Sequence, residues 1–194
     1  GTSASDVLRL LQEGRTRQRF VTIPEGMPSI MVYERLAANR FLTGSIDVPP
    51  EGSVLPDTYA FRRGETRAAV LGRMQAAMNR AFADAWAKRT ALAYPHDRNE
   101  ALALASIIEK ETSKAAERRI VAGVYTNRLR LGMRLQADPT IIYPITRGKA
   151  LGRRIRQSEI DAVNGYNTYS KAGLPIGPIA NPGRASLLAA LNPA

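Results

Sequence analysis

The sequence predicts an α+β fold, in which a small α/β lobe joins a mainly helical, loop-rich domain with some short strands. Three observations lead to this prediction. Helical and strand-like hydrophobic patterns alternate between residues 6 and 39, whereas between residues 66 and 131 apolar residues recur mostly at the spacing of helices. After residue 131 the chain is rich in Gly and Pro, which favour turns and loops.

The first part of the chain contains the elements of the small lobe. Turn-forming residues over 44–50 mark its candidate boundary, so the chain divides into segments 1–50 and 51–194. Within the lobe, hydrophobic patterning predicts, in order, a helix over 6–12, a strand over 19–23, a turn over 24–26 and a helix over 29–39.

Longer helices follow this boundary. A turn-rich segment over 51–59 predicts a loop or a short strand, and one apolar stripe then predicts a helix over 66–89 with Met74 and Met78 in the core. Residues 100–108 are apolar on every side, which indicates a buried helix. The next helix is expected from about residue 113, with an inner face of Ile120, Val121, Val124, Tyr125 and Leu129.

Composition excludes several classes of protein. The chain has 194 residues, no Cys and one His, so it has no disulfide scaffold, zinc–thiolate site, cysteine nucleophile or multi-histidine metal centre. The single histidine, His96, lies in a break between helical patterns, and we expect it in a surface loop. No apolar run approaches the roughly 20 residues that span a bilayer.

The formal net charge of +11 leaves two interpretations open. The basic residues cluster at 15–19 and 147–156, and aromatic residues do not alternate with them, so a platform for stacking single-stranded nucleic acid is not indicated. Either these residues form a solvated basic surface, or they attract a polyanion. Nucleic acid, a carboxylate-rich polymer and an anionic membrane surface are the candidate polyanions.

Three carboxylates, those of Glu109, Glu111 and Glu117, lie where two predicted helices meet. Because successive helical residues differ by about 100°, Glu109 and Glu111 point about 200° apart, and only one of them can face a given cleft. Burial of one carboxyl would raise its pKa and suit it to act as a general acid. The alternative is a polar helix end with Lys110 and Arg118 as the partners of the carboxylates.

The turn-rich last third carries polar side chains that suit a neutral, hydroxylated ligand such as a sugar. Amide and phenol groups lie in segments 136–140 and 166–169, and a further segment rich in Gly and Pro covers 173–179. A well-ordered loop region without a ligand is the alternative. A short helix is expected over 182–191.

Seven motifs follow one another along the chain: Val21–Gly26, Leu55–Tyr59, Leu104–Thr112, Asn127–Thr140, Tyr166–Tyr169, Gly173–Gly183 and Ala190–Pro193. Together they resemble the YceG-like family of endolytic murein transglycosylases, and the resemblance covers nearly the whole chain. It implies a LysM-like lobe over 1–50, truncated at its start, and a YceG-like catalytic domain over 51–194, truncated at its end. In the family a single membrane helix precedes the lobe.

The resemblance therefore implies a soluble fragment of a single-pass protein of the bacterial inner membrane, with its catalytic domain in the periplasm. Its implied partners are peptidoglycan glycan strands, peptidoglycan synthases and the membrane, the last through an anchor that this chain lacks. Nucleic acid is not an expected partner. A basic nucleic-acid-binding protein and a catalytically silent peptidoglycan-binding module stay open as alternative functions.

The resemblance also implies the chemistry and its residues. The catalytic acid of the family corresponds to Glu111, which would protonate the bond between MurNAc and GlcNAc and then deprotonate the C6 hydroxyl of MurNAc, leaving a 1,6-anhydro end. No cofactor and no metal are implied. The possible auxiliary residues are Glu109, Glu117 and Asp138, and the implied substrate-binding residues are Thr112, Asn127, Gln136, Thr140, Tyr166, Asn167 and Tyr169.

Overall fold

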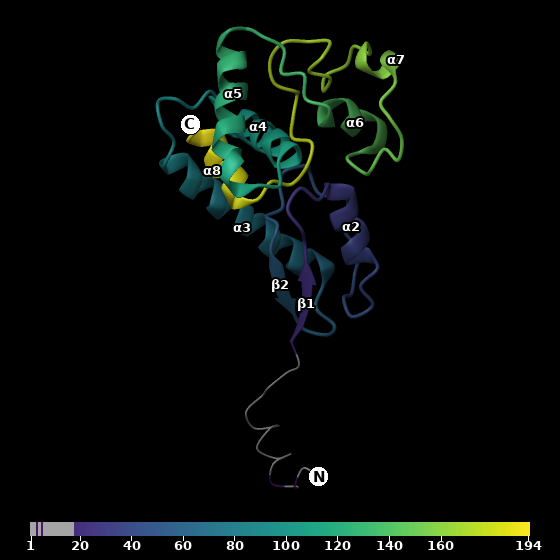
Figure 1. The fold of residues 1–194 in the computed structure, drawn as a ribbon. Helices are drawn as coiled ribbons and strands as arrows, with labels where there is room; N and C mark the ends of the chain where they lie inside the picture. The colour runs from purple at the N-terminus through teal and green to yellow at the C-terminus, as the bar shows by residue number, and fades with distance from the viewer. Residues whose placement is uncertain (1–2, 4, 6–17) are drawn as a thin grey trace.

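The computed structural model describes Ser3, Ser5 and residues 18–194, and it confirms a mixed α+β architecture (Figure 1). The helix predicted over 6–12 lies outside the described residues. In Figure 1 the two strands and α2 form the lower lobe, and α4 to α8 gather above it. The elements are β1 (Arg19–Thr22), α2 (Ser29–Ala37), β2 (Thr58–Phe61), α3 (Arg67–Ala87), α4 (Arg98–Glu111), the 3-10 turn η1 (Ala115–Glu117), α5 (Arg118–Arg130), α6 (Pro139–Thr146), α7 (Gln157–Ile160) and α8 (Arg184–Leu191).

The small lobe is built on an antiparallel pair of strands. β1 and β2 pair so that Val21 lies opposite Tyr59 and Thr22 opposite Thr58. In β1 Val21 is buried, whereas Phe20 and Thr22 are exposed, so one face of the sheet covers a core. That core contains Val21, Ile23, Met27, Val32, Leu36, Leu42, Val54, Phe61, Val70, Leu71 and Met74.

A second, larger hydrophobic core lies in the upper lobe, with residues from Leu55 to Leu191. The long helix α3 takes part in both cores: Val70 and Met74 belong to the smaller one, and Met78 belongs to the larger one. The division of the chain into segments 1–50 and 51–194 stays a prediction about domains, and the smaller core includes residues from both segments.

α3 and α4 confirm the long helix and the buried helix that the sequence predicts. Thr66 caps α3 by accepting the amide of Ala69 at 3.1 Å, and Met74 and Met78 are fully buried. In α4, residues 101–108 are all buried, and α5 and α8 pack against them. Within the described part of the chain, no helix has both the length and the apolar character needed to cross a membrane.

α5 differs from the prediction at its start and on its buried face. It begins at Arg118, after η1, rather than near residue 113. Ile120 and Val124, which the hydrophobic pattern predicts to be inside, are 61% and 48% exposed. Tyr125 and Leu129 are buried as predicted, and the other inner positions are taken by Arg118, Ala122, Gly123 and Thr126.

The last third contains more helix than its turn-forming residues suggest. α6 begins at Pro139, a position that suits proline because the first turn of a helix needs no amide donor. Buried amides hold the loops beyond it. Asn181 is fully buried, donates to the Met27 carbonyl at 2.9 Å and accepts the amide of Val54 at 3.0 Å. This side chain therefore connects the loop before α8 to the small lobe.

Candidate functional site

The structure places the carboxylates at the end of α4 in different surroundings. The Glu109 side chain is 3% exposed; its Oε1 lies 2.9 Å from Arg118, and its Oε2 accepts the amide of Gly183 at 2.8 Å. Both oxygens of Glu109 are therefore engaged within the fold. The burial that the sequence predicts for one of the two glutamates falls on Glu109, whereas Glu111 is exposed.

Arg118 is the centre of this buried cluster. Its side chain is 9% exposed, and the Nη2 atom that contacts Glu109 also lies 3.0 Å from Glu25, in the turn after β1. One guanidinium thus joins the small lobe, the end of α4 and the start of α5 through charge-assisted hydrogen bonds. Arg118 is the carboxylate partner that the sequence suggests at this helix end.

Glu117 is the last residue of η1, the turn between α4 and α5. It accepts the Lys114 ammonium and the Thr112 hydroxyl, each at 2.9 Å, and the amide of Lys114 donates to the Thr112 hydroxyl at 3.1 Å. The hydrogen bond from Lys114 and then that from Thr112 hold the pKa of Glu117 below its ordinary value. Thr112 and Glu117 therefore close the turn between α4 and α5, and the ionic partner of Glu117 is a lysine.

Glu111 is the last residue of α4 and lies beside Tyr125 of α5. Tyr125 is only 5% exposed. Burial, then the charge of Glu111 and a hydrogen bond to it, raise the pKa of the Tyr125 phenol. The sequence pattern predicts Tyr125 only as a core residue, because its ring counts as apolar, and does not reveal that its hydroxyl faces the carboxylate.

A second phenol borders the same carboxylate. Tyr169 donates to Asp138 Oδ1 at 2.6 Å, and this hydrogen bond is the largest cause of the rise in the pKa of Tyr169 to about 12. The negative charge of Glu111 adds to the rise, and the positive charge of Arg128 opposes it. We refer to Glu111, Tyr125, Arg128, Asp138 and Tyr169 as the Glu111 cluster.

The Glu111 cluster has the groups needed to transfer a proton. Within the described residues Glu111 forms no ion pair, and it is exposed to solvent. The phenols of Tyr125 and Tyr169 are protonated at neutral pH, as tyrosines ordinarily are, and their raised pKa values keep them so at higher pH. A carboxyl in this position can give a proton to a bound oxygen and take one back.

Three of the predicted sugar-binding residues use their polar groups within the fold. Thr140 is fully buried and donates to the Ala137 carbonyl at 2.7 Å. The Asn167 side chain donates to three backbone carbonyls between residues 159 and 162. Together with Thr112, these residues hold the turn and loops near the Glu111 cluster.

The other predicted sugar-binding residues lie in separate places. Gln136 is exposed, and its φ of 54° lies in the left-handed region that residues other than Gly rarely adopt. Asn127 is exposed on α5, two residues and about 200° from Tyr125, so it faces away from the Glu111 cluster. Tyr166 packs against Tyr143 of α6, with 4.8 Å between the ring centroids.

A pocket of about 480 Å³ lies between the two lobes, and we call it the interlobe pocket. Two of its residues, Lys110 and Pro139, are the chain neighbours of Glu111 and Asp138, so the pocket adjoins the Glu111 cluster. The sequence does not predict it, because its walls come from distant segments. These are the Pro24–Pro28 turn, Met31, Lys110, Pro139, Ile142, Tyr143, residues 148–151 and Ile179.

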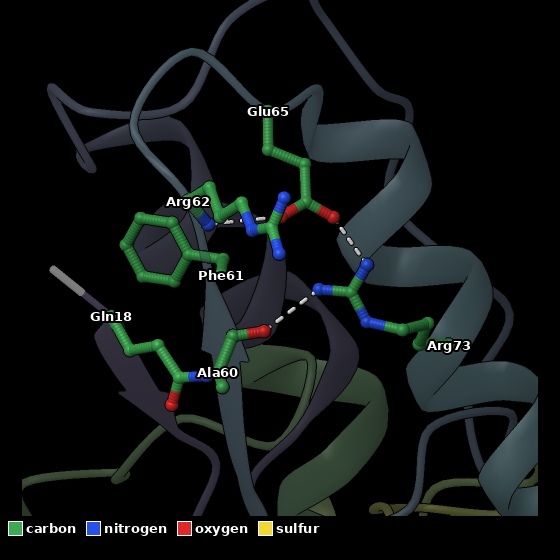
Figure 2. Close-up of a pocket in the computed structure, with 6 residues that line it drawn as sticks. All are labelled: Gln18, Ala60, Phe61, Arg62, Glu65 and Arg73. Carbon is green, nitrogen blue, oxygen red and sulfur yellow. Dashed lines mark hydrogen bonds and ion pairs between the residues drawn. The ribbon is translucent and has the colours of Figure 1, made fainter. Parts of the chain in front are cut away.

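A pocket of about 410 Å³ lies in the small lobe, and Figure 2 shows the residues that line it. Arg73 donates there to the Ala60 carbonyl at 2.8 Å and to Glu65, and Glu65 also accepts the amide of Arg62 at 3.0 Å. The Glu65 and Arg73 side chains drawn in Figure 2 thus bond to each other, and Arg73 also bonds to the backbone of β2. No residue of the predicted catalytic site lines this pocket.

Some of the basic residues serve the fold itself. Arg67 donates to the Leu36 carbonyl near the end of α2 at 2.8 Å, and Arg130 donates to the Leu92 carbonyl at 2.8 Å. His96 is exposed, as predicted, and its ring lies 3.0 Å from Glu100. Among the described residues, no group of three or more His, Cys, Asp or Glu side chains could hold a metal ion.

Comparisons with known proteins agree with the motif pattern. A sequence model of the YceG-like family matches residues 1–194. A Bacillus subtilis protein named endolytic murein transglycosylase is 32% identical over 155 residues, which are 80% of this chain and 42% of that protein. A protein of the same name from Streptococcus pneumoniae D39 is 33% identical over 147 residues, covering 73% of this chain and 26% of that protein. The chain thus spans less than half the length of these relatives.

The fold is also similar to that of a solved structure. The crystal structure of a yceG-like protein from Listeria monocytogenes superposes with a TM-score of 0.74 at 27% sequence identity. The match covers 100% of this chain and 73% of that chain. Both lobes of the present structure therefore have counterparts in that protein.

Proposed function

This chain belongs to the YceG-like family, and on that premise we propose that it carries the catalytic part of an endolytic murein transglycosylase. Such an enzyme cuts the MurNAc–GlcNAc bond inside peptidoglycan glycan strands and leaves 1,6-anhydro-MurNAc ends. The observation that supports this proposal most is the position of Glu111. Glu109 and Glu117 are engaged by Arg118 and Lys114, whereas Glu111 is exposed beside two phenols.

In the proposed reaction Glu111 acts first as an acid and then as a base. Its carboxyl gives a proton to the glycosidic oxygen, the bond from that oxygen to C1 of MurNAc breaks, and positive charge develops at C1. The Glu111 carboxylate then takes the proton of the C6 hydroxyl of the same sugar, and O6 bonds to C1. The carboxyl is protonated again at the end, and no water is consumed.

The neighbours of Glu111 have supporting roles in this proposal. Tyr125 holds the Glu111 carboxyl from the buried side, and the Tyr169–Asp138 pair presents hydroxyl and carboxylate oxygens to the sugar hydroxyls. A bound glycan would exclude water from this end of α4, and the lower local dielectric would strengthen the interactions of the Glu111 carboxyl with its neighbours. Arg128 supplies positive charge on the same side.

The remaining predicted site residues differ in whether their polar side chains already bond within the fold. We assign contacts with the sugar to Gln136, which is exposed, and to Tyr166, which packs against Tyr143 of α6. For Thr112, Thr140 and Asn167 we propose that they shape the cleft, since their side chains already bond within the fold. Glu109, Glu117 and Asn127 are assigned no contact with the reacting atoms.

The wider setting of the enzyme is also part of the proposal. We assign the small lobe a LysM-like role beside the catalytic domain, with the division at residues 50 and 51. The site of action is the bacterial cell wall on the periplasmic side, and the protein is held there by a membrane anchor outside this chain. Glycan strands are the substrate, and peptidoglycan synthases are the proposed protein partners.

Product chemistry tests this function. Isolated glycan strands are digested in water enriched in heavy oxygen, and the new ends are identified by mass spectrometry. The proposal predicts 1,6-anhydro ends without heavy oxygen, because water takes no part in the reaction. Reducing ends that contain heavy oxygen would instead identify a hydrolase, with Asp138 as the candidate second carboxylate. No new ends at all would indicate a silent peptidoglycan-binding module.

A further inference from the structure

The interlobe pocket is mostly apolar, whereas the Glu111 cluster that it adjoins is made of charged and phenolic groups. Its volume of about 480 Å³ lies within the range of ligand pockets, about 300–1,000 Å³. Its walls are mostly apolar, with Met27 and Met31 from the small lobe and Ile142 and Leu151 from the upper one. A hydroxyl-rich sugar placed there would lose hydrogen bonds to water without replacing them, which is costly.

The charged groups of the interlobe pocket differ in whether they are paired. Glu25 contacts Arg118 at 3.0 Å, and Lys149 pairs with Glu34. Lys110, by contrast, has no acidic partner among the described residues. The pocket therefore presents apolar walls and one ammonium group that is available to a carboxylate.

The position of Lys110 relates the pocket to the reaction. Lys110 directly precedes Glu111 in α4, and its Cδ lies close to Gly26, where an added Cβ would be 3.5 Å away. Likewise Pro139 directly follows Asp138. A substituent on the sugar that reacts at Glu111 can therefore reach the interlobe pocket.

We propose that the interlobe pocket binds the lactyl-peptide substituent of MurNAc. Resting on the proposed function, this inference adds a substrate feature to it: the enzyme recognises strands that carry peptides. The methyl groups of the lactyl unit and of alanine match the apolar walls, and a peptide carboxylate matches the Lys110 ammonium. Electrostatic complementarity of this kind favours peptide-bearing strands over bare ones.

A binding experiment tests the proposal without requiring catalysis. The probe is N-acetylmuramoyl-L-alanyl-D-isoglutamine, and the reference compounds are its carboxyl amide and the neutral sugar N,N′-diacetylchitobiose. Binding is followed by NMR through the side-chain methyl groups of Met31, Ile142 and Leu151. We expect the acid to shift these signals, with binding about tenfold weaker for the amide and for Lys110→Gln.

Matched variants locate the effect. Ala150→Trp adds bulk at an exposed position of the pocket wall and should abolish the shifts, whereas Ala172→Trp, on an exposed loop outside the pocket, should preserve them. Lys88→Gln, which removes an exposed charge at the end of α3, should leave the affinity unchanged. Equal binding of the acid and the amide, or unchanged affinity in both Lys110→Gln and Ala150→Trp, would overturn the proposal.

Product analysis on the same preparations separates this inference from the proposed function. Anhydro ends without peptide binding would overturn the pocket assignment and leave the transglycosylase intact. Peptide binding at the pocket without any anhydro product would support the pocket assignment and overturn the proposed transglycosylase activity. It would identify a module that binds peptidoglycan without cutting it.

Discussion

Arg118 and Glu109 form a buried ion pair, with 2.9 Å between Nη2 and Oε1 and side chains that are 9% and 3% exposed. The pair fixes the start of α5 against the end of α4, and Glu25 adds a contact from the small lobe at 3.0 Å. It also decides which carboxylate is available for chemistry. With Glu109 held by Arg118, Glu111 is the one that faces outward two residues later.

We predict that Glu109→Gln lowers the free energy of unfolding by roughly 3 kcal/mol. The cost is near the lower end of the range for a broken buried pair, because Glu25 still faces the Arg118 guanidinium. Urea unfolding measures it. The control is Glu34→Gln, which removes an exposed ion pair with Lys149 and should cost less than about 1 kcal/mol. Equal losses in the two variants would contradict the structural role of Glu109.

We predict that Tyr125→Phe lowers kcat about tenfold or more while KM changes little, because the phenol holds the Glu111 carboxyl rather than the sugar. The pH profile of kcat should shift as well, since the variant lacks a hydrogen bond to the catalytic carboxyl. The control is Tyr33→Phe in α2, which should leave both unchanged. A loss of stability without a change in kcat or in the pH profile would make Tyr125 purely structural.

We predict that Asp138→Asn lowers the pKa of Tyr169 from about 12 towards its ordinary value of 10.0. The hydrogen bond to the Asp138 carboxylate is the largest cause of the raised value, and the variant also loses the negative charge. NMR of ring-labelled tyrosine resolves the individual titrations. If Tyr169 titrates at the same pH in both proteins, the Tyr169–Asp138 contact is not formed in solution.

Glu51 provides a test through pH dependence. Burial raises its pKa above 4.5, although the amide of Ser29 donates to it at 2.8 Å. Because the folded-state pKa is raised, the folded protein binds this proton more tightly than the unfolded chain. The resulting stability is fully present below pH 4.5 and is lost as the pH rises through the raised pKa.

We therefore predict that the free energy of unfolding of Glu51→Gln falls less steeply with rising pH than that of the natural protein. Relative to the natural protein, the variant should gain stability as the pH rises from below 4.5 to neutrality. Urea unfolding at a series of pH values measures the difference. Stability curves that stay parallel over this range would show that Glu51 does not titrate with a raised pKa.

Hydrophobic periodicity predicts the helical framework well and fails where a charge is buried. α3 and α4 follow their apolar patterns, whereas the inner face of α5 is predicted correctly at Tyr125 and Leu129 and wrongly at Ile120 and Val124. Arg118 occupies an inner position there because Glu109 neutralises its charge. Hydrophobic periodicity counts arginine as polar, so it places Arg118 outside and wrongly predicts Ile120 and Val124 to be buried. The sequence does not predict α6, because the helix begins at Pro139 and contains Pro144, and prolines are typical of loops.

The candidate site is predictable in part. The motifs single out Glu111, Asp138 and Tyr169, and the structure brings these three together. Motifs cannot distinguish a side chain that binds a ligand from one that bonds to a nearby carbonyl, as Asn167 does. The interlobe pocket escapes prediction altogether, because its walls come from segments that only the tertiary fold brings together.

The most direct test of the central claim compares Glu111→Gln with the natural protein on isolated glycan strands. Glu117→Gln, which removes a nearby carboxylate that bonds to Thr112 and Lys114, is the matched control. We predict 1,6-anhydro ends from the natural protein and from Glu117→Gln, and none from Glu111→Gln, whose urea unfolding curve stays that of a folded protein. Anhydro ends formed by Glu111→Gln at the natural rate would contradict the assignment of Glu111 as the catalytic acid.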